Sequence, residues 1–186
     1  MIPNFWKTQP SNIKRIFSIL AFFFLATLVT TVGVLTPLSP EDTNALNSEL
    51  EKIQQETKNM DVWQSTAFIF TNNFRICLLL FVPIAGPAIG FYAFYNTGLV
   101  IGAQSSVMHM PALTVFVALF VFPHTWMEFI AYSMALAQSV WLIRRIIQRK
   151  AKNELVKTCI FIAVCAAILL AAALAEAYLI ASIPKA

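Results

Sequence analysis

The sequence predicts an all-α protein, a polytopic helical membrane bundle with about five transmembrane helices and one extracytoplasmic amphipathic helix. Of its 186 residues, 59% are hydrophobic and only 12% are charged, against roughly 25% charged residues in an ordinary soluble domain. Apolar runs of about 20 residues, the length that crosses a bilayer as a helix, recur along the chain. This composition excludes a disordered chain, a nucleic-acid-binding module and a typical cytosolic enzyme.

We expect a single integral membrane domain over residues 1–186. The predicted spans are residues 16–35, 76–94, 98–122, 125–143 and 158–183. The first span has a longer apolar core than a signal peptide and lacks a small-x-small cleavage site, which indicates a retained helix. The second span has a helical lead-in from Val62, and Pro111 interrupts the third.

The polar stretch at residues 36–66 is predicted to form an outer loop containing one helix. Ser39 is a good N-cap, Pro40 suits the first helical position, and the acids that follow favour a helix N-terminus. Apolar residues then recur at helical spacing, at Leu46, Leu50 and Ile53. Such a narrow apolar face predicts a helix that lies against the membrane or caps the bundle.

The distribution of charge predicts the orientation of the chain. Nine of the thirteen basic residues lie before the first span or in the basic inner loop at residues 144–157, where Glu154 is the one opposing acid. Six acids lie in the outer loop. The positive-inside rule therefore places the N-terminus inside and the C-terminus outside. The net charge of +4 reflects this topology, and no nucleic-acid partner is expected.

Small residues at four-residue spacing predict close helix packing. Four glycines form two such pairs, Gly86 with Gly90 and Gly98 with Gly102. We expect the second and third spans to form a tight hairpin that turns near Tyr95 and Asn96. Alternatively, Pro83, Pro87 and Pro111 break these helices and expose backbone to a substrate, as in transporters. The fifth span carries a stripe of small residues that favours assembly within the chain or between chains: Ala163, Ala167, Ala171 and Ala175.

Polar residues from three spans are predicted to meet in one layer near the outer face of the membrane. They are Asn72, Asn73, Arg75, His124, Glu128 and Glu176. Intramembrane charges usually pair, so Arg75 is expected to form a structural bridge with Glu128 or Glu176. A second interpretation is that His124 and Glu128, four residues apart on one helix face, bind a metal or relay protons.

Gln104 and His109, next to Pro111, suggest a mid-membrane polar path. Such residues more often make hydrogen bonds between helices. The chain contains no Gly-x-Ser-x-Gly, no His-Glu-x-x-His and no phosphate-binding glycine loop. We therefore expect a protein that is not an enzyme and has no cofactor or resident metal. The three cysteines lie in apolar stretches and are interpreted as small buried hydrophobic residues.

The middle of the chain resembles the stage II sporulation protein M family. Residues 70–75 are similar to that family's phenylalanine followed by Asn-Asn-x-Arg, residues 96–102 to its Asn-Gly-x-x-x-Gly turn, and residues 123–128 to its Pro-His-Gly-x-x-Glu segment. Thr97 is an additional residue within the second motif, and Thr125 replaces the usual glycine of the third. The positions that match the family are Asn73, Arg75, Asn96, Gly98, Gly102, His124 and Glu128.

The resemblance implies a multi-pass protein of a prokaryotic cytoplasmic membrane. The family's namesake acts with peptidoglycan-degrading partners during engulfment, although sporulation itself is not carried over to this chain. The leading hypothesis is a non-enzymatic scaffold or complex subunit. Its expected partners are the lipid bilayer and other membrane proteins or further copies of the chain. The alternative is a small-solute or ion transporter or channel that uses the outer polar cluster.

Overall fold

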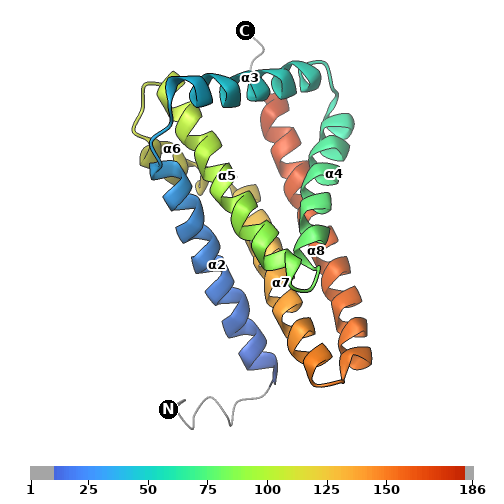
Figure 1. Ribbon diagram of the computed structural model, residues 1–186. Coiled ribbons are helices and arrows are strands. Elements are labelled where there is room, and N and C mark those ends of the chain that lie inside the picture. The colour runs from blue at the N-terminus through green and yellow to red at the C-terminus, as the bar shows by residue number, and fades with distance from the viewer. Residues whose placement is uncertain (1–10, 183–186) are drawn as a thin grey trace.

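The computed structural model describes residues 11–182, apart from the side chain of Asn153, and all regular elements of this part of the chain are helices (Figure 1). The helices are α2 (Ser11–Leu35), α3 (Pro40–Thr57), α4 (Val62–Leu80), α5 (Ala85–Val107), α6 (Ala112–Leu119), α7 (Pro123–Ile147) and α8 (Ala151–Ser182). The all-α prediction is confirmed for these residues. Lys7 and Ile183, the last residue of the predicted fifth span, lie outside the described residues.

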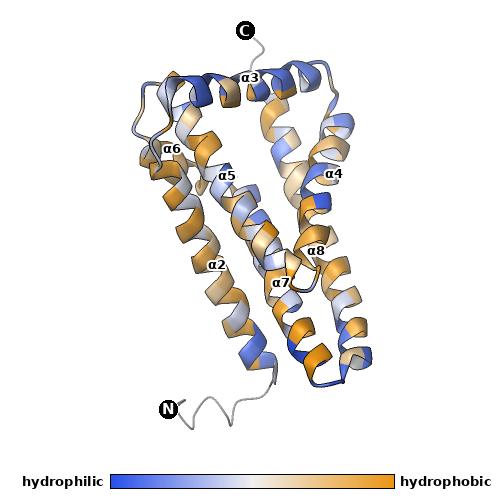
Figure 2. Ribbon diagram, viewed as in Figure 1, coloured by the Kyte–Doolittle hydropathy of each residue, from blue (hydrophilic) through white to orange (hydrophobic). Residues whose placement is uncertain are grey.

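Two helices are long and apolar enough to cross a membrane, namely residues Ser11–Leu35 and Glu154–Ser182. The helices α5 and α6 meet the same criteria only as a pair, which is bent by 118° at the break between them. Figure 2 shows hydrophilic residues along α3 and at the turn between α7 and α8, with apolar residues prevailing along α2 and α8 between these two ends. This separation is the pattern of a membrane protein.

The predicted amphipathic helix is confirmed as α3. Ser39 is its N-cap, with Oγ accepting a hydrogen bond from the backbone N–H of Asp42 at 3.1 Å, and Pro40 is at the start of the helix. No residue of α3 is fully buried. The helix lies across one end of the bundle (Figure 1), where Asn47 Nδ2 donates to the carbonyl oxygen of Ala103 in α5 at 3.5 Å. Of the two predicted placements, α3 adopts the one that caps the bundle.

The turn predicted near Tyr95 and Asn96 is wrong, because both residues lie inside α5. The chain turns instead at residues 81–84. There, Ile84 has φ 70° and the N–H of Ala85 donates to the carbonyl oxygen of Pro83 at 2.8 Å, which is a tight γ-turn. A Cβ at Gly86 would lie 2.2 Å from the carbonyl oxygen of Leu80, so only glycine fits immediately after this turn.

The second turn in this region is at residues 108–111, before α6. Predicted spans 76–94 and 98–122 are therefore replaced by two helices with different bounds, α4 and α5, followed by the short α6. The four glycines at residues 86–102 all belong to the single helix α5.

The last two glycines of α5 bring it against α2, whereas Gly86 and Gly90 lie near Leu80 at the end of α4. A Cβ at Gly98 would lie 2.2 Å from the carbonyl oxygen of Thr30 and 2.8 Å from Cα of Gly33, both in α2. A Cβ at Gly102 would lie 3.2 Å from the carbonyl oxygen of Val34, also in α2. Gly90 packs against Leu136 of α7. Backbones can approach this closely only where side chains are absent.

The most buried helix is α7, which supplies Phe129, Ala131, Ala135, Leu136 and Ala137 to the core. On its flank, α8 buries Cys165, Leu169, Ala172, Ala173 and Ala177. The predicted alanine stripe of α8 lies on a different face, because Ala163, Ala167, Ala171 and Ala175 are all exposed. This stripe is therefore not used for packing among the described residues.

Substituting Gly98→Ala is expected to lower the free energy of unfolding by about 2 kcal/mol, because the added methyl group meets backbone atoms that cannot rotate away. Gly102→Ala is the matched control, since its nearest neighbour is 3.2 Å away. Thermal unfolding of both variants in detergent measures the difference. Equal melting temperatures for the two variants would contradict the close contact between α2 and α5.

Candidate functional site

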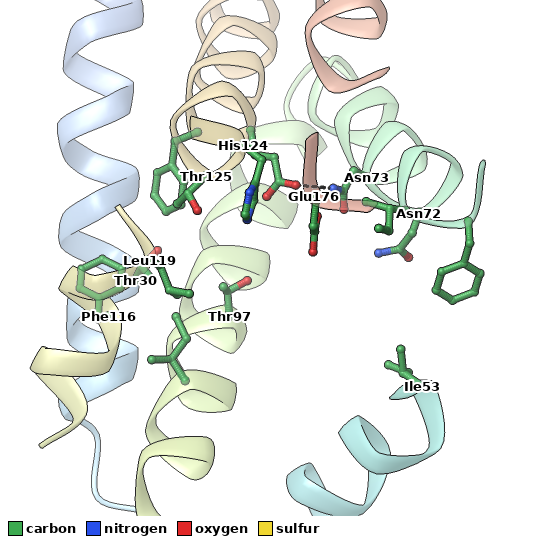
Figure 3. Close-up of a pocket in the computed structure, with 15 residues that line it drawn as sticks. Thr30, Ile53, Asn72, Asn73, Thr97, Phe116, Leu119, His124, Thr125 and Glu176 are labelled. Atoms are coloured by element: carbon green, nitrogen blue, oxygen red, sulfur yellow. Dashed lines mark hydrogen bonds between the residues drawn. The ribbon is translucent and has the colours of Figure 1, made fainter. Parts of the chain in front are cut away.

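A cavity of about 330 Å³ lies beneath α3, and each of the seven helices contributes to its wall (Figure 3). Ile53 of α3 closes it from one side, while Thr30 of α2 and Thr97 of α5 line another. The aromatic and aliphatic part of the wall includes Phe116 and Leu119 of α6. The cavity is thus a property of the whole bundle rather than of one helix pair.

Polar side chains from α4, α7 and α8 converge in this cavity. Asn73 Nδ2 donates to Glu128 Oε1 at 2.6 Å, which joins α4 to α7. His124 lies one turn before Glu128 on the same face of α7, and Glu176 reaches the cavity from α8. Figure 3 shows His124, Asn73 and Glu176 gathered close together, with Asn72 beside them.

Five of the six residues of the predicted outer cluster therefore line one cavity, but Arg75 does not. The predicted bridge from Arg75 to Glu128 or Glu176 is wrong. Arg75 is exposed, and it forms no ion pair or hydrogen bond within the described part of the chain. Two residues along a helix correspond to roughly 200° of rotation, so Asn73 and Arg75 point to opposite sides of α4.

The cavity offers two carboxyl groups and further hydrogen-bond acceptors. In residues 11–182, neither Glu128 nor Glu176 forms an ion pair. Glu128 has an amide donor as its partner. Across the same residues, no group of three or more His, Cys, Asp or Glu side chains could hold a metal ion. The chemistry of this arrangement suits a cation or an amine that donates hydrogen bonds.

The predicted mid-membrane path through Gln104 and His109 is not formed. Gln104 is in the last turn of α5, and His109 is exposed in the turn that follows, with φ 53°. Neither residue lines the cavity. Because α5 begins at Ala85 rather than Gly98, its residues from Gly98 onward lie about 20 Å further towards the α3 end than predicted.

A second polar cluster, absent from the sequence-based candidates, lies at the opposite end of the bundle. It is centred on an ion pair between Arg15 of α2 and Glu154 of α8, which are 6% and 2% exposed. Gln138 of α7 accepts a hydrogen bond from Arg15 and donates through Nε2 to Glu154 Oε1 and to Thr158 Oγ1, each at 2.9 Å. Three helices are therefore joined by one buried network.

Aromatic and basic side chains extend this network outward. Arg15 lies over the ring of Trp141, 4.7 Å from its centroid, and Arg144 lies 5.4 Å from the same centroid. Arg145 Nε is 3.6 Å from Glu154 Oε2. The signal in the sequence is Glu154 itself, a single acid within the strongly basic inner loop. Counting charges treats this acid as part of the loop whose net charge sets the orientation of the chain. The count does not reveal that Glu154 is an ion-pair partner.

Substituting Glu154→Gln is expected to destabilise the protein by about 3–5 kcal/mol, since Arg15 is then left as a buried cation without a counter-charge. The double variant Arg15→Met with Glu154→Leu removes both charges and should lose less stability than Glu154→Gln alone. Melting temperatures in detergent give the comparison, with Glu56→Gln on exposed α3 as the control. A double variant less stable than the single variant would contradict a buried ion pair.

Comparison with known proteins gives one family. The family described as stage II sporulation protein M matches residues 19–179, which run from α2 to α8 and include every residue of the outer cluster. No curated protein matches the chain. No solved structure matches it either.

Proposed function

The chain belongs to the stage II sporulation protein M family, and we propose that this membrane protein is a non-enzymatic, multi-pass scaffold or subunit of a complex in the cytoplasmic membrane. The proposal includes five membrane crossings, by α2, α4, α5, α7 and α8. The shortest of these, α4, has 19 residues, or about 28 Å of helix. That length is comparable with the hydrocarbon core of a bilayer.

The polar residues of α4 and α7 are compatible with helices that cross the membrane. Many of their polar side chains point into the bundle: Ser133, Gln138 and Ser139 of α7 are 0–1% exposed, and Asn73 and Glu128 bond to each other. The start of α2 and the end of α8 lie at opposite ends of the bundle (Figure 1). With the basic turn between α7 and α8 inside, α3 lies on the outer surface.

The observation that carries the scaffold proposal is the exposed guanidinium of Arg75. It lies 13 residues into α4, about 20 Å from the start of that helix. Leu78 and Leu79, which follow it, are 40% and 49% exposed. A charge in such apolar surroundings is costly in a bilayer unless it meets an acidic or polar partner. The described part of this chain supplies none, so another membrane helix with an acidic residue would complete the pairing.

The alanine stripe of α8 supports the same proposal. Its four residues are exposed although α8 packs on both α4 and α7 through other side chains. Small residues at four-residue spacing allow another helix to approach closely. Two outward-facing surfaces are therefore available to partner proteins or to another copy of the chain. One carries the charge of Arg75 on α4, and the other carries the small side chains of the alanine stripe on α8.

Purification of the full-length chain from its native membranes in mild detergent should recover a stable hetero-complex or homo-oligomer. Arg75→Gln is expected to lower the amount of recovered complex at least tenfold, which corresponds to about 1.4 kcal/mol of binding free energy. The melting temperature of the isolated chain should stay unchanged. Arg149→Gln removes the same charge from the exposed α7–α8 turn and serves as the control. Size-exclusion chromatography with light scattering gives the mass. A wild-type chain that is always monomeric would contradict the proposal.

The second candidate function is transport of a small cation, favoured by the cavity in which two carboxylates have no basic partner among the described residues. Glu128→Gln tests it cleanly, because a glutamine oxygen still accepts the hydrogen bond from Asn73 while the charge is lost.

For a transporter, Glu128→Gln should reduce cation or proton flux into proteoliposomes at least tenfold without changing the melting temperature. Glu56→Gln, on the exposed surface of α3, should leave the flux unchanged. Wild-type flux no higher than that of protein-free liposomes would remove this candidate.

A further inference from the structure

A small cleft of about 120 Å³ lies between α2 and α7 at the basic end of the bundle, far from the outer cavity. Lys14 and Ser18 of α2 form one wall, and Val140, Trp141 and Arg144 of α7 form the other. Two cationic side chains, a hydroxyl group and an indole thus surround one space. Val140 is 41% exposed, so the apolar wall of the cleft continues into the outer surface of the bundle.

The wall of the cleft is held in place by hydrogen bonds and by a cation over a ring. Trp141 is only 8% exposed, and its Nε1 donates to Ser18 Oγ at 3.3 Å. Ser18 Oγ in turn donates to the carbonyl oxygen of Lys14 at 2.9 Å. The guanidinium of Arg144 lies over the Trp141 ring. A fixed indole therefore positions one cation of the cleft.

Basic residues outnumber acidic residues at this end of the bundle. Glu154 is the one acid between residues 129 and 175, and its carboxylate already forms ion pairs with Arg15 and Arg145. Within the described residues, Arg144 has no carboxylate at ion-pair distance. An anion would complement the charge of the cleft.

We propose that this cleft binds the phosphate of an anionic phospholipid in the inner leaflet. Basic pockets between helices on the cytoplasmic side are suited to anionic headgroups, and a tryptophan at the membrane interface is well placed beside a headgroup. Phe17 of α2, three residues after Lys14 on the helix, is 49% exposed and offers the acyl chains an apolar surface near the cleft. The phosphate accepts hydrogen bonds from Arg144 and Lys14, while the acyl chains remain in the bilayer.

Native mass spectrometry of the full-length chain in mild detergent tests this site. Dioleoyl-phosphatidylglycerol should remain bound at collision energies that remove dioleoyl-phosphatidylcholine. Arg144→Gln and Lys14→Gln should each weaken phosphatidylglycerol binding about fivefold, the factor expected for one basic residue near anionic lipid. Arg149→Gln should leave binding within twofold of the wild type, because Arg149 lies at the same end of the bundle but outside the cleft.

Three results would overturn the proposal. The first is equal retention of phosphatidylglycerol and phosphatidylcholine by the wild type. The second is a loss for Arg149→Gln as large as that for Arg144→Gln, which would show attraction to net charge rather than to the cleft. The third is equal competition by glycerol phosphate, which would identify a site for a soluble anion. Melting temperatures of each variant verify folding, and Lys14→Gln provides the second test if Arg144→Gln unfolds.

Discussion

The buried ion pair between Arg15 and Glu154 constrains the whole bundle. A buried charge without a partner costs several kcal/mol, so α2 and α8 must lie where Arg15 reaches Glu154 and Gln138. This requirement places α7 between α2 and α8. Ser139, the next residue of α7, donates to the carbonyl oxygen of Val82 at 3.0 Å and holds the tip of the α4–α5 hairpin. These contacts at one end of the bundle thereby help to position α2, α4, α5, α7 and α8, five of the helices that line the cavity.

The sequence predicted the helices that have unambiguous ends. The basic loop at residues 144–157 includes the turn between α7 and α8, and Ser39 with Pro40 marks the start of α3. It failed between residues 76 and 122, because a nearly continuous apolar stretch does not reveal where the chain turns. There the turn depends on the γ-turn at Ile84 and the contact at Gly86. The later glycines, which resembled a family turn, instead allow α5 to approach α2.

Convergence of residues at one level along the bundle was easier to predict than direction around a helix. The predicted direction in which each helix runs placed Glu128 and Glu176 at one level of the bundle, and both residues line the cavity. Arg75 follows Asn73 by two residues and lies at a similar level along α4, but it faces away from the cavity. An ion pair requires the correct helix face as well as the correct level. His109 failed for another reason, since its depth depended on a wrong start for α5. Glu154 was not among the predicted site residues. An acid near a loop can either lie exposed in that loop or form a buried ion pair, and the sequence alone does not distinguish these two cases.

The two polar clusters contain similar groups but differ in how their charges are matched. At the inner end, one carboxylate has Arg15, Arg145 and Gln138 as partners and is 2% exposed. Substitution there is expected to act on stability. At the outer end, Glu128 and Glu176 line a cavity without a cation in ion-pair contact among the described residues. Carboxyl groups without a basic partner contribute less to folding and remain available to a ligand. This difference favours a structural role for the cluster around Arg15 and leaves the cavity beneath α3 as the candidate ligand site of the bundle interior.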